Sequence, residues 1–364
     1  MKVKKISVVI GTRPQIIKSQ PLILSLKSKF EVDVIYTGQH YDYELSKKFF
    51  KDLKLSKPNH NLGVGKGSAI QQISKIILKL EKIFSKSRPD LVIVPGDTTS
   101  AVAGAIAASK MKIKLVHLEA GARSNQFYMA EEVNRRIIDH CSDILFAPTK
   151  GCLENLKNEL VFGESYFVGD TMYDLFLKFY KKHDFASFKK KTKSNQILIT
   201  IHRAENIENK NNLKKISEII NNLNKKGFSI IFPVHPHTER KIKEFGFDIL
   251  AKKMPPIGYI DLMKIMAESK LVMTDSGGLQ KEAYWMGKPC VTFRENTEWV
   301  ETIEEGVNKL VGVVPKKIKE SINNFYTPEQ NYSKNLYGDG RTSEKIVKIL
   351  NRCHCERSDE AISK

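Results

Sequence analysis

The chain lacks any run of about eighteen consecutive apolar residues, the length that a membrane-spanning helix needs. Its first ten residues carry charges and then β-branched residues. A secretory signal peptide instead has an apolar stretch followed by small residues at a cleavage site. We therefore expect a cytoplasmic protein that has no membrane partner.

Cysteine is scarce and scattered. The five cysteines stand at positions 141, 152, 290, 353 and 355, an odd number with no regular spacing. This pattern does not indicate a disulfide framework. Cys353 and Cys355 offer two sulfur ligands, whereas a structural zinc site needs four ligands. We expect reduced thiols, no metal and no cofactor.

Acidic residues are outnumbered, because 41 Asp and Glu stand against 60 Lys and Arg, for a formal net charge of +19. Such an excess is typical of proteins that bind nucleic acid. Here the lysines fall on helical stretches, such as 75–86, 210–226 and 316–319, with no aromatic-plus-basic stripe or helix-turn-helix pattern. We interpret them as solvated helix faces and expect no nucleic-acid partner, although a basic nucleic-acid-binding protein stays an alternative. A positive field would also attract an anionic small substrate.

Length and composition indicate two globular domains, since the 364 residues are 41% hydrophobic and 28% charged. Short apolar runs alternate with amphipathic helical stretches, a pattern that predicts βαβ units and a parallel sheet. The expected strands are residues 6–10, 32–36, 91–94, 114–117, 144–147 and 166–168 in the first half, and 197–201, 229–234, 271–274, 290–293 and 310–312 in the second.

A polar, Lys-rich stretch at 183–195 separates these two series of strands. We expect an α/β protein with two doubly wound, Rossmann-like domains, residues 1–185 and 186–350, and a ligand cleft between them. The last helix of the second domain is a candidate to pack back on the first. Residues 351–364 lack apolar periodicity and predict an exposed tail.

Polar residues follow the expected strands, where doubly wound folds bind their ligands. In the first domain the candidates are Arg13, Lys18, Gln39, His40, Asp97 and Glu119, joined by Glu131 and Arg135 at the start of a later helix. Arg13 and Lys18 are placed to meet an anion at a helix N-terminus. The alternative roles are helix capping for Asp97 and compensation of the helix dipole for Glu131.

The second domain repeats this arrangement. His202 follows one strand, and Ser276, Gly277 and Gly278 open a helix directly after another. Backbone N–H groups at such a helix start can cradle a diphosphate, and glycine permits its close approach. A plain N-cap turn is the alternative.

Taken together, the motifs resemble one known family. They are GTRPQIIK at 11–18, the Gln39-His40 pair, GDTTS at 96–100, HLEAGAR at 117–123, EEVNRR at 131–136, HRAEN at 202–206, PVHPH at 233–237 and TDSGGLQKEA at 274–283. From Gly11 to about Gly312 the chain is similar to the non-hydrolysing UDP-N-acetylglucosamine 2-epimerases. The resemblance implies the two-domain glycosyltransferase-B architecture and a homodimer.

The resemblance also implies roles for the candidate residues. UDP is expected to be bound by Arg13, His202, Ser276, Gly277 and Glu282, with Arg13 and His202 near the diphosphate; Gly278 stays a candidate from its place at the helix start. The UDP-sugar is also expected to contact Lys18, Gln39, His40 and Arg135, and the catalytic candidates are Asp97, Glu119, Glu131 and His202. A carboxylate such as Glu282 can accept hydrogen bonds from the ribose hydroxyls.

The activity implied is the interconversion of UDP-N-acetylglucosamine and UDP-N-acetylmannosamine, through elimination of UDP and re-addition to a glycal, for surface polysaccharide precursors. The stretch 280–301 is also similar to that of UDP-2,3-diacetamido-2,3-dideoxyglucuronate 2-epimerases, which gives an alternative substrate. Gln15, Ile16, Ala204 and Trp299 depart from the pattern of many bacterial members. A glycosyltransferase of the same architecture is a more distant alternative.

Overall fold

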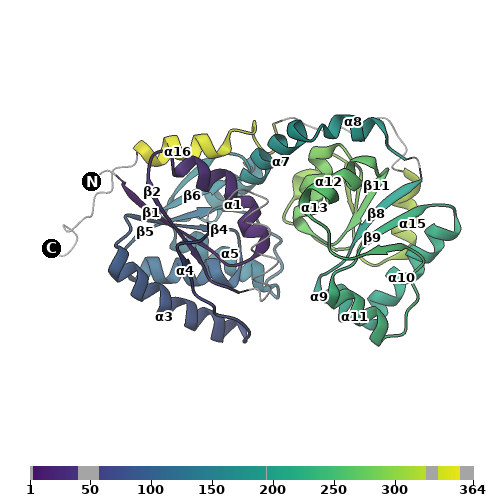
Figure 1. Ribbon diagram of the computed structural model, residues 1–364, viewed down its shortest axis with the longest axis horizontal. Coiled ribbons are helices and arrows are strands. Elements are labelled where there is room, and N and C mark those ends of the chain that lie inside the picture. The colour runs from purple at the N-terminus through teal and green to yellow at the C-terminus, as the bar shows by residue number, and fades with distance from the viewer. Residues whose placement is uncertain (1–2, 40–56, 194, 325–334, 353–364) are drawn as a thin grey trace. The chain divides into compact units, whose positions relative to one another are not determined.

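A computed structural model describes residues 3–39, 57–193, 195–324 and 335–352 (Figure 1). The chain forms two compact units, Met1–Leu175 with Lys334–Lys364, and Phe176–Ser333. Each unit contains a parallel β-sheet flanked by helices. The expected α/β class with two doubly wound units is confirmed.

The first unit is built on a sheet of seven described strands in the order β3-β2-β1-β4-β5-β6-β7. Its strands are β1 (Lys5–Ile10), β2 (Glu31–Tyr36), β3 (His60–Asn61), β4 (Leu91–Pro95), β5 (Lys114–Leu118), β6 (Ile144–Ala147) and β7 (Glu164–Phe167). Its helices are α1 (Arg13–Leu26), α3 (Ala69–Ser87), α4 (Thr99–Lys110), α5 (Ala130–Cys141), α6 (Lys150–Asn158) and α16 (Thr342–Arg352). Helix α7 (Thr171–Lys182) begins in this unit and continues into the second.

The central strands of this sheet are parallel and almost wholly buried. Strand β1 pairs with β2 from Lys5 opposite Glu31 to Ile10 opposite Tyr36, and with β4 on its other side. Because helices cover both faces of these strands, the side chains on both faces are apolar. The strands therefore appear in the sequence as short uninterrupted hydrophobic segments.

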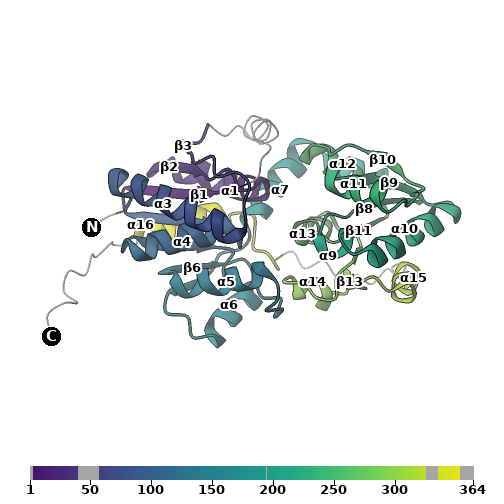
Figure 2. The ribbon, with the colours of Figure 1, turned by 90° about the horizontal axis from the view of Figure 1, so that it is seen from below.

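Helix α3 shows how a flanking helix attaches to the sheet. The Ser68 hydroxyl caps the helix by accepting the N–H of Gln71, and Ile76, Leu80 and Phe84 form a buried stripe at four-residue spacing. Full burial of each such side chain contributes about 1.5–3 kcal/mol. Helix α3 packs beside α4, as Figure 2 shows.

The last described helix, α16, packs on α1 in the first unit. The carboxylate of Asp174 in α7 accepts the N–H groups of Thr342 and Ser343, at 3.0 and 2.7 Å, and so caps the N-terminus of α16. The units therefore differ from the domain bounds predicted from the sequence, 1–185 and 186–350. Helix α16 extends to Arg352, and Asn351 and Arg352 are exposed; the rest of the expected tail lies outside the described residues.

The second unit has six described strands in the order β10-β9-β8-β11-β12-β13, the same winding pattern as the first. The strands are β8 (Gln196–Thr200), β9 (Ser229–Pro233), β10 (Lys252–Met254), β11 (Leu271–Thr274), β12 (Cys290–Thr292) and β13 (Asn308–Leu310). The helices are α8 (Phe185–Lys190), α9 (Ala204–Ile207), α10 (Lys210–Lys225), α11 (Pro236–Glu244), α12 (Tyr259–Glu268), α13 (Gly277–Met286), α14 (Val300–Glu304) and α15 (Pro315–Asn324).

The core of the second unit joins the sheet to α10. Ile197 and Ile199 of β8 and Phe232 of β9 belong to the same buried cluster as Ile216 and Ile220 of α10. In neither unit is a described helix both long enough and apolar enough to cross a membrane.

Candidate active site

Each sheet has a topological switch point, where the strand order reverses and where doubly wound folds bind ligands outside the carboxyl ends of the strands. In the first unit this point lies between β1 and β4, and in the second between β8 and β11. The predicted residues after these four strands are therefore the ones that the topology places at the two switch points.

At the first switch point, Gln15 connects the turns after β1 and β4. Its Oε1 accepts the N–H groups of Gly11 and Thr12, at 2.8 and 3.1 Å, and its Nε2 donates to Pro95 O at 2.6 Å. A side chain at Gly11 would overlap the Ser100 hydroxyl, so this turn requires glycine. The side chain of Arg13, at the start of α1, lies outside the described residues.

Glu119 and Lys18 form an ion pair at this edge of the sheet. The Glu119 side chain is buried, and its backbone has a φ of 69°, in the left-handed region that non-glycine residues rarely adopt. Such a conformation costs about 1–3 kcal/mol and is concentrated at functional sites. A Cβ at Gly96 would lie 3.1 Å from Lys18 Nζ, so the turn after β4 passes close to the pair.

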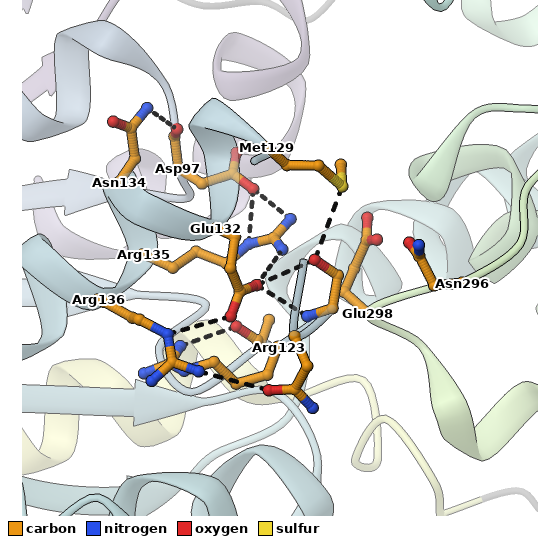
Figure 3. Close-up of polar contacts among 12 residues, drawn as sticks. Asp97, Arg123, Met129, Glu132, Asn134, Arg135, Arg136, Asn296 and Glu298 are labelled. Carbon is orange, nitrogen blue, oxygen red and sulfur yellow. Dashed lines mark hydrogen bonds and ion pairs between the residues drawn. The ribbon is translucent and has the colours of Figure 1, made fainter. Parts of the chain in front are cut away.

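Asp97 and Arg135 form the second ion pair of this region (Figure 3). The Asp97 Oδ2 atom is 2.6 Å from Arg135 Nη2 and 2.9 Å from Nε. Asn134 also donates to the backbone oxygen of Asp97, at 2.8 Å. The start of α5 thus fixes both the side chain and the main chain of Asp97, a contact that a helix-capping role for Asp97 does not explain.

Glu132, which the sequence did not single out, is the buried member of the glutamate pair at the start of α5. Its carboxylate accepts the N–H and hydroxyl of Ser124, at 2.8 and 3.0 Å, and contacts Arg135 and Arg136 at 3.3 Å each (Figure 3). Glu131 is half-buried and makes no side-chain hydrogen bond within the described part of the chain. Glu131 is therefore the one available to a ligand.

Gln39 lies just after β2. Its Oε1 accepts the N–H and hydroxyl of Ser100, at 3.2 and 2.7 Å, and Ser100 also contacts the Thr37 hydroxyl. Gln39 is thus tied to the N-terminal turn of α4 beside Asp97. His40, its predicted neighbour in the site, lies outside the described residues.

In the second unit, Asp275 connects the turns after β8 and β11. It is fully buried and accepts the N–H groups of His202 and Arg203, at 3.1 and 3.0 Å. Its Oδ1 lies 3.3 Å from His202 Nδ1, while the His202 side chain is about half exposed, 48%. Sequence reasoning named His202 and missed Asp275, which fixes its backbone.

The turn after β11 opens α13, with Ser276 as N-cap. A Cβ at Gly277 would overlap the Glu298 carboxylate and lie 3.3 Å from the indole nitrogen of Trp299, so the position needs glycine. Gly278 is half-buried in the first turn, and Glu282 lies buried further along α13. The free N–H groups of such a first turn suit an anionic ligand.

Among the described residues, no three His, Cys, Asp or Glu side chains gather closely enough to hold a metal ion. Cys141, Cys152 and Cys290 are free thiols. Burial raises the pKa of Cys290 to about 12, so this thiol is a packing residue rather than a nucleophile.

Comparison of the sequence and the fold with known proteins assigns the chain to a family. The family model described as UDP-N-acetylglucosamine 2-epimerase matches residues 23–351. A UDP-N-acetylglucosamine 2-epimerase homolog of Methanococcus maripaludis is 44% identical over 358 residues, which cover 95% of this chain and 99% of the relative. A UDP-2,3-diacetamido-2,3-dideoxy-D-glucuronate 2-epimerase of Pseudomonas aeruginosa is 38% identical over 352 residues, covering 95% and 99%.

A crystal structure of the Methanocaldococcus jannaschii UDP-GlcNAc 2-epimerase in complex with UDP-GlcNAc and UDP is similar to this fold, with a TM-score of 0.88 and 38% identity. The similarity covers 95% of this chain and 99% of that one. With two switch points that carry the expected motifs, the chain belongs to the UDP-N-acetylglucosamine 2-epimerase family, and it is an isomerase that acts on UDP-sugars.

Proposed function

We propose that this enzyme inverts C2 of UDP-N-acetylglucosamine and so interconverts it with UDP-N-acetylmannosamine. The observation that carries the proposal is the presence of two ion-paired carboxylates near one switch point, Glu119 with Lys18 and Asp97 with Arg135. The Methanocaldococcus jannaschii structure, which holds UDP-GlcNAc and UDP, supports this choice of substrate.

UDP is proposed to bind to the second unit. The N-terminus of α13 presents Ser276, Gly277 and Gly278 to the diphosphate, and Glu282 accepts hydrogen bonds from the ribose. His202 and Arg13 are the proposed partners of the diphosphate. Gln39, His40 and Lys18 complete the proposed substrate contacts.

The proposed reaction is an elimination followed by re-addition. A carboxylate removes the C2 proton while the bond between C1 and the UDP oxygen breaks, which releases UDP and a glycal. UDP then adds back to C1 as a proton is delivered to the other face of C2. Two faces need two proton carriers, and we propose that Asp97, Glu119 and Glu131 supply them.

Because the C2 hydrogen is only weakly acidic, departure of the diphosphate must be assisted. Groups that donate hydrogen bonds to the leaving diphosphate stabilise its developing charge. We assign this role to Arg13 and His202. Ion pairing favours the charged form of a carboxylate, which is the form that accepts a proton.

Solvent exchange tests the reaction. The purified protein, incubated with UDP-N-acetylglucosamine in heavy water, is expected to give both epimers with deuterium at C2, as read by proton NMR. Epimerisation with full retention of the C2 hydrogen contradicts the mechanism. Release of UDP with no epimer formed points instead to a transferase or a hydrolase.

UDP-2,3-diacetamido-2,3-dideoxyglucuronate is the second candidate substrate, because the Pseudomonas aeruginosa relative carries that name at 38% identity. Its C6 carboxylate would need a cation or a helix N-terminus as partner. Measurement of kcat/KM for both sugars decides between them, and a large preference for the uronate would replace the primary assignment.

We further propose that the enzyme works as a cytoplasmic homodimer, on the basis of the family resemblance. Light scattering coupled to gel filtration is expected to give twice the mass of the 41.5 kDa chain. A monomer at micromolar concentration contradicts the proposal.

A further inference from the structure

His117 is a fully buried histidine at the end of β5, next but one to Glu119. Its Nδ1 lies 2.5 Å from Asp139 Oδ1, and its Nε2 lies 2.9 Å from the backbone oxygen of Gly96. A carbonyl oxygen can only accept, so Nε2 must donate. A carboxylate can only accept too, so Nδ1 must also donate if Asp139 is ionised.

The surroundings of Asp139 favour its ionised form. Its Oδ2 accepts the N–H of Gly121 at 3.1 Å and the Nη2 of Arg123 at 2.6 Å. Burial works against ionisation, but His117 and Arg123 outweigh it and lower the pKa of Asp139. All four hydrogen bonds around this carboxylate and ring are then satisfied only when both ring nitrogens carry a proton.

These hydrogen bonds connect the two turns that carry Asp97 and Glu119. Gly96 is held on both sides, because its N–H donates to Leu118 O at 2.8 Å while its carbonyl accepts from His117. Gly96 immediately precedes Asp97. On the other turn, Asp139 holds the N–H of Gly121, two residues after Glu119.

The two glycines and Glu119 all have positive φ, at 64° for Gly96, 78° for Gly121 and 69° for Glu119. Glycine has both signs of φ open to it, and Glu119 is strained at its positive φ, so these turns keep one conformation only where their surroundings restrain it. The hydrogen bonds from His117 and Asp139 supply this restraint. Neither side chain reaches the surface, so neither touches a substrate.

We propose that His117 is held as an imidazolium by Asp139 and that this pair positions the backbone of both turns on which Asp97 and Glu119 stand. The catalytic consequence rests on the proposed function, whereas the protonation state does not. His117 and Asp139 are thus positioning residues. With Asp139 ionised, a neutral His117 would leave one of its two ring contacts unmade.

NMR of protein labelled with ¹⁵N in its histidines tests the protonation state without any assay of activity. For His117 we expect two ring nitrogens of the protonated type and two slowly exchanging N–H protons at pH 7, assigned by their loss in His117→Gln. One unprotonated ring nitrogen in the wild type overturns the proposal.

Asp139→Asn provides a second spectroscopic test. The asparagine oxygen is expected to face Gly121 and Arg123, and its amide then donates to Nδ1. The ring becomes neutral and keeps only the proton on Nε2. Two ring N–H protons in this variant would show that Asp139 does not hold the charge. Glu159→Gln, which changes the other carboxylate partner of Arg123, is the matched control and should leave both His117 protons in place.

Kinetics test the positioning. In His117→Gln we expect kcat to fall by about 10²-fold, the loss that a displacement of about 1 Å brings at a reacting centre. The Kd for UDP should change little, because the proposed UDP contacts lie chiefly in the second unit. A UDP titration with the binding stoichiometry of the wild type shows that the variant is fully folded, so that a loss confined to kcat does not come from an unfolded fraction. A folded His117→Gln enzyme with wild-type kcat overturns the positioning role.

These experiments distinguish failure of the proposed function from failure of the proposal about His117. If the wild type fails to epimerise UDP-N-acetylglucosamine, the proposed function fails while the NMR result still decides the state of His117. If His117→Gln does not fold, the ring signals that change between the wild-type and Asp139→Asn spectra assign His117 and decide its protonation state.

Discussion

The carboxylate of Asp275, directly after β11, accepts the backbone N–H of His202, two residues after β8, at 3.1 Å. Arg203 N and Asn206 Nδ2 donate to the same carboxylate, at 3.0 and 3.1 Å. One fully buried side chain therefore fixes the loop that carries His202 across the switch point of the second unit.

Asp275→Asn tests this arrangement. The substitution puts an amide NH₂, which donates, where a carboxylate oxygen accepted hydrogen bonds from other donors. The loss of these bonds should cost about 1–3 kcal/mol of stability. Displacement of His202 should weaken UDP binding about tenfold, the equivalent of about 1.4 kcal/mol. Calorimetric titration with UDP and thermal unfolding measure both effects. Asp248→Asn, at an exposed position, is the control, and unchanged UDP affinity in Asp275→Asn would refute the idea.

The adjacent glutamates of α5 provide a matched pair. Glu131→Gln should lower turnover by about 10²–10⁴-fold with little change in stability, because glutamine cannot take a proton. Glu132→Gln should instead lower stability by about 1–3 kcal/mol, because this buried carboxylate accepts hydrogen bonds from Ser124 and contacts Arg135. Turnover and melting temperature separate the two roles. Normal turnover in Glu131→Gln would leave the second proton carrier to be sought at Asp97.

Glu119→Gln should also lower turnover by about 10²–10⁴-fold, since the amide keeps the shape of the side chain but can neither accept nor donate the catalytic proton. UDP affinity should stay near that of the wild type, because Glu119 stands in the first unit, at the end of β5. Steady-state kinetics and UDP titration check both expectations. A parallel loss of UDP affinity would indicate that Glu119 holds the nucleotide instead.

Gly277→Ala should weaken UDP binding and destabilise the second unit, because its Cβ would overlap the Glu298 carboxylate. Overpacking of this kind typically costs about 1–3 kcal/mol. Gly258→Ala is a suitable control, since the nearest atom to its Cβ would be Asp261 Oδ2 at 3.8 Å, an ordinary contact. Equal UDP affinity and melting temperature in the two variants would show that the neighbourhood of Gly277 adjusts freely.

Lys288 predicts a pH dependence of stability. Burial, reinforced by Lys189, lowers the pKa of Lys288 to about 8 in the folded protein, while an unfolded lysine titrates near 10.4. Between about pH 8 and pH 10.4 the unfolded chain binds more protons, so this group makes the free energy of unfolding rise with pH. Lys288→Met should remove that rise, measured by urea unfolding at pH 8 and pH 10.

Lys317→Met, at an exposed position, is the control for this series and should keep the rise of the wild type. If Lys288→Met follows the same pH profile as the wild type, the ammonium of Lys288 stays protonated throughout and its burial is relieved by a contact to solvent.

The central strands could be predicted from the sequence because both of their faces are buried, which leaves short unbroken apolar runs. Two of the edge strands, β3 and β10, could not. They are short, His60–Asn61 and Lys252–Met254, and consist mainly of polar and charged residues, so no apolar run marks them. These strands are defined by backbone hydrogen bonds to a neighbouring strand, and the hydrophobic periodicity of the sequence does not reveal such pairing.

The sequence predicts a site at the turns after the strands, because strand ends hold the ligands of doubly wound folds. It does not predict the residues that fix those turns. Gln15 and Pro95 lie 80 positions apart, and Asp139 reaches His117 from another element. The doublet Glu131-Glu132 gave no sign of which carboxylate turns inward, because that choice depends on Ser124, Arg135 and Arg136.

Helix α16 has a consequence for synthesis of the chain. The cap that Asp174 provides to Thr342 joins positions 168 residues apart, with the whole second unit between them. During translation the whole second unit is synthesised before α16, the helix that packs on α1. The first unit is thus the last to close, and a fragment that stops at Leu175 leaves that face of α1 open to aggregation.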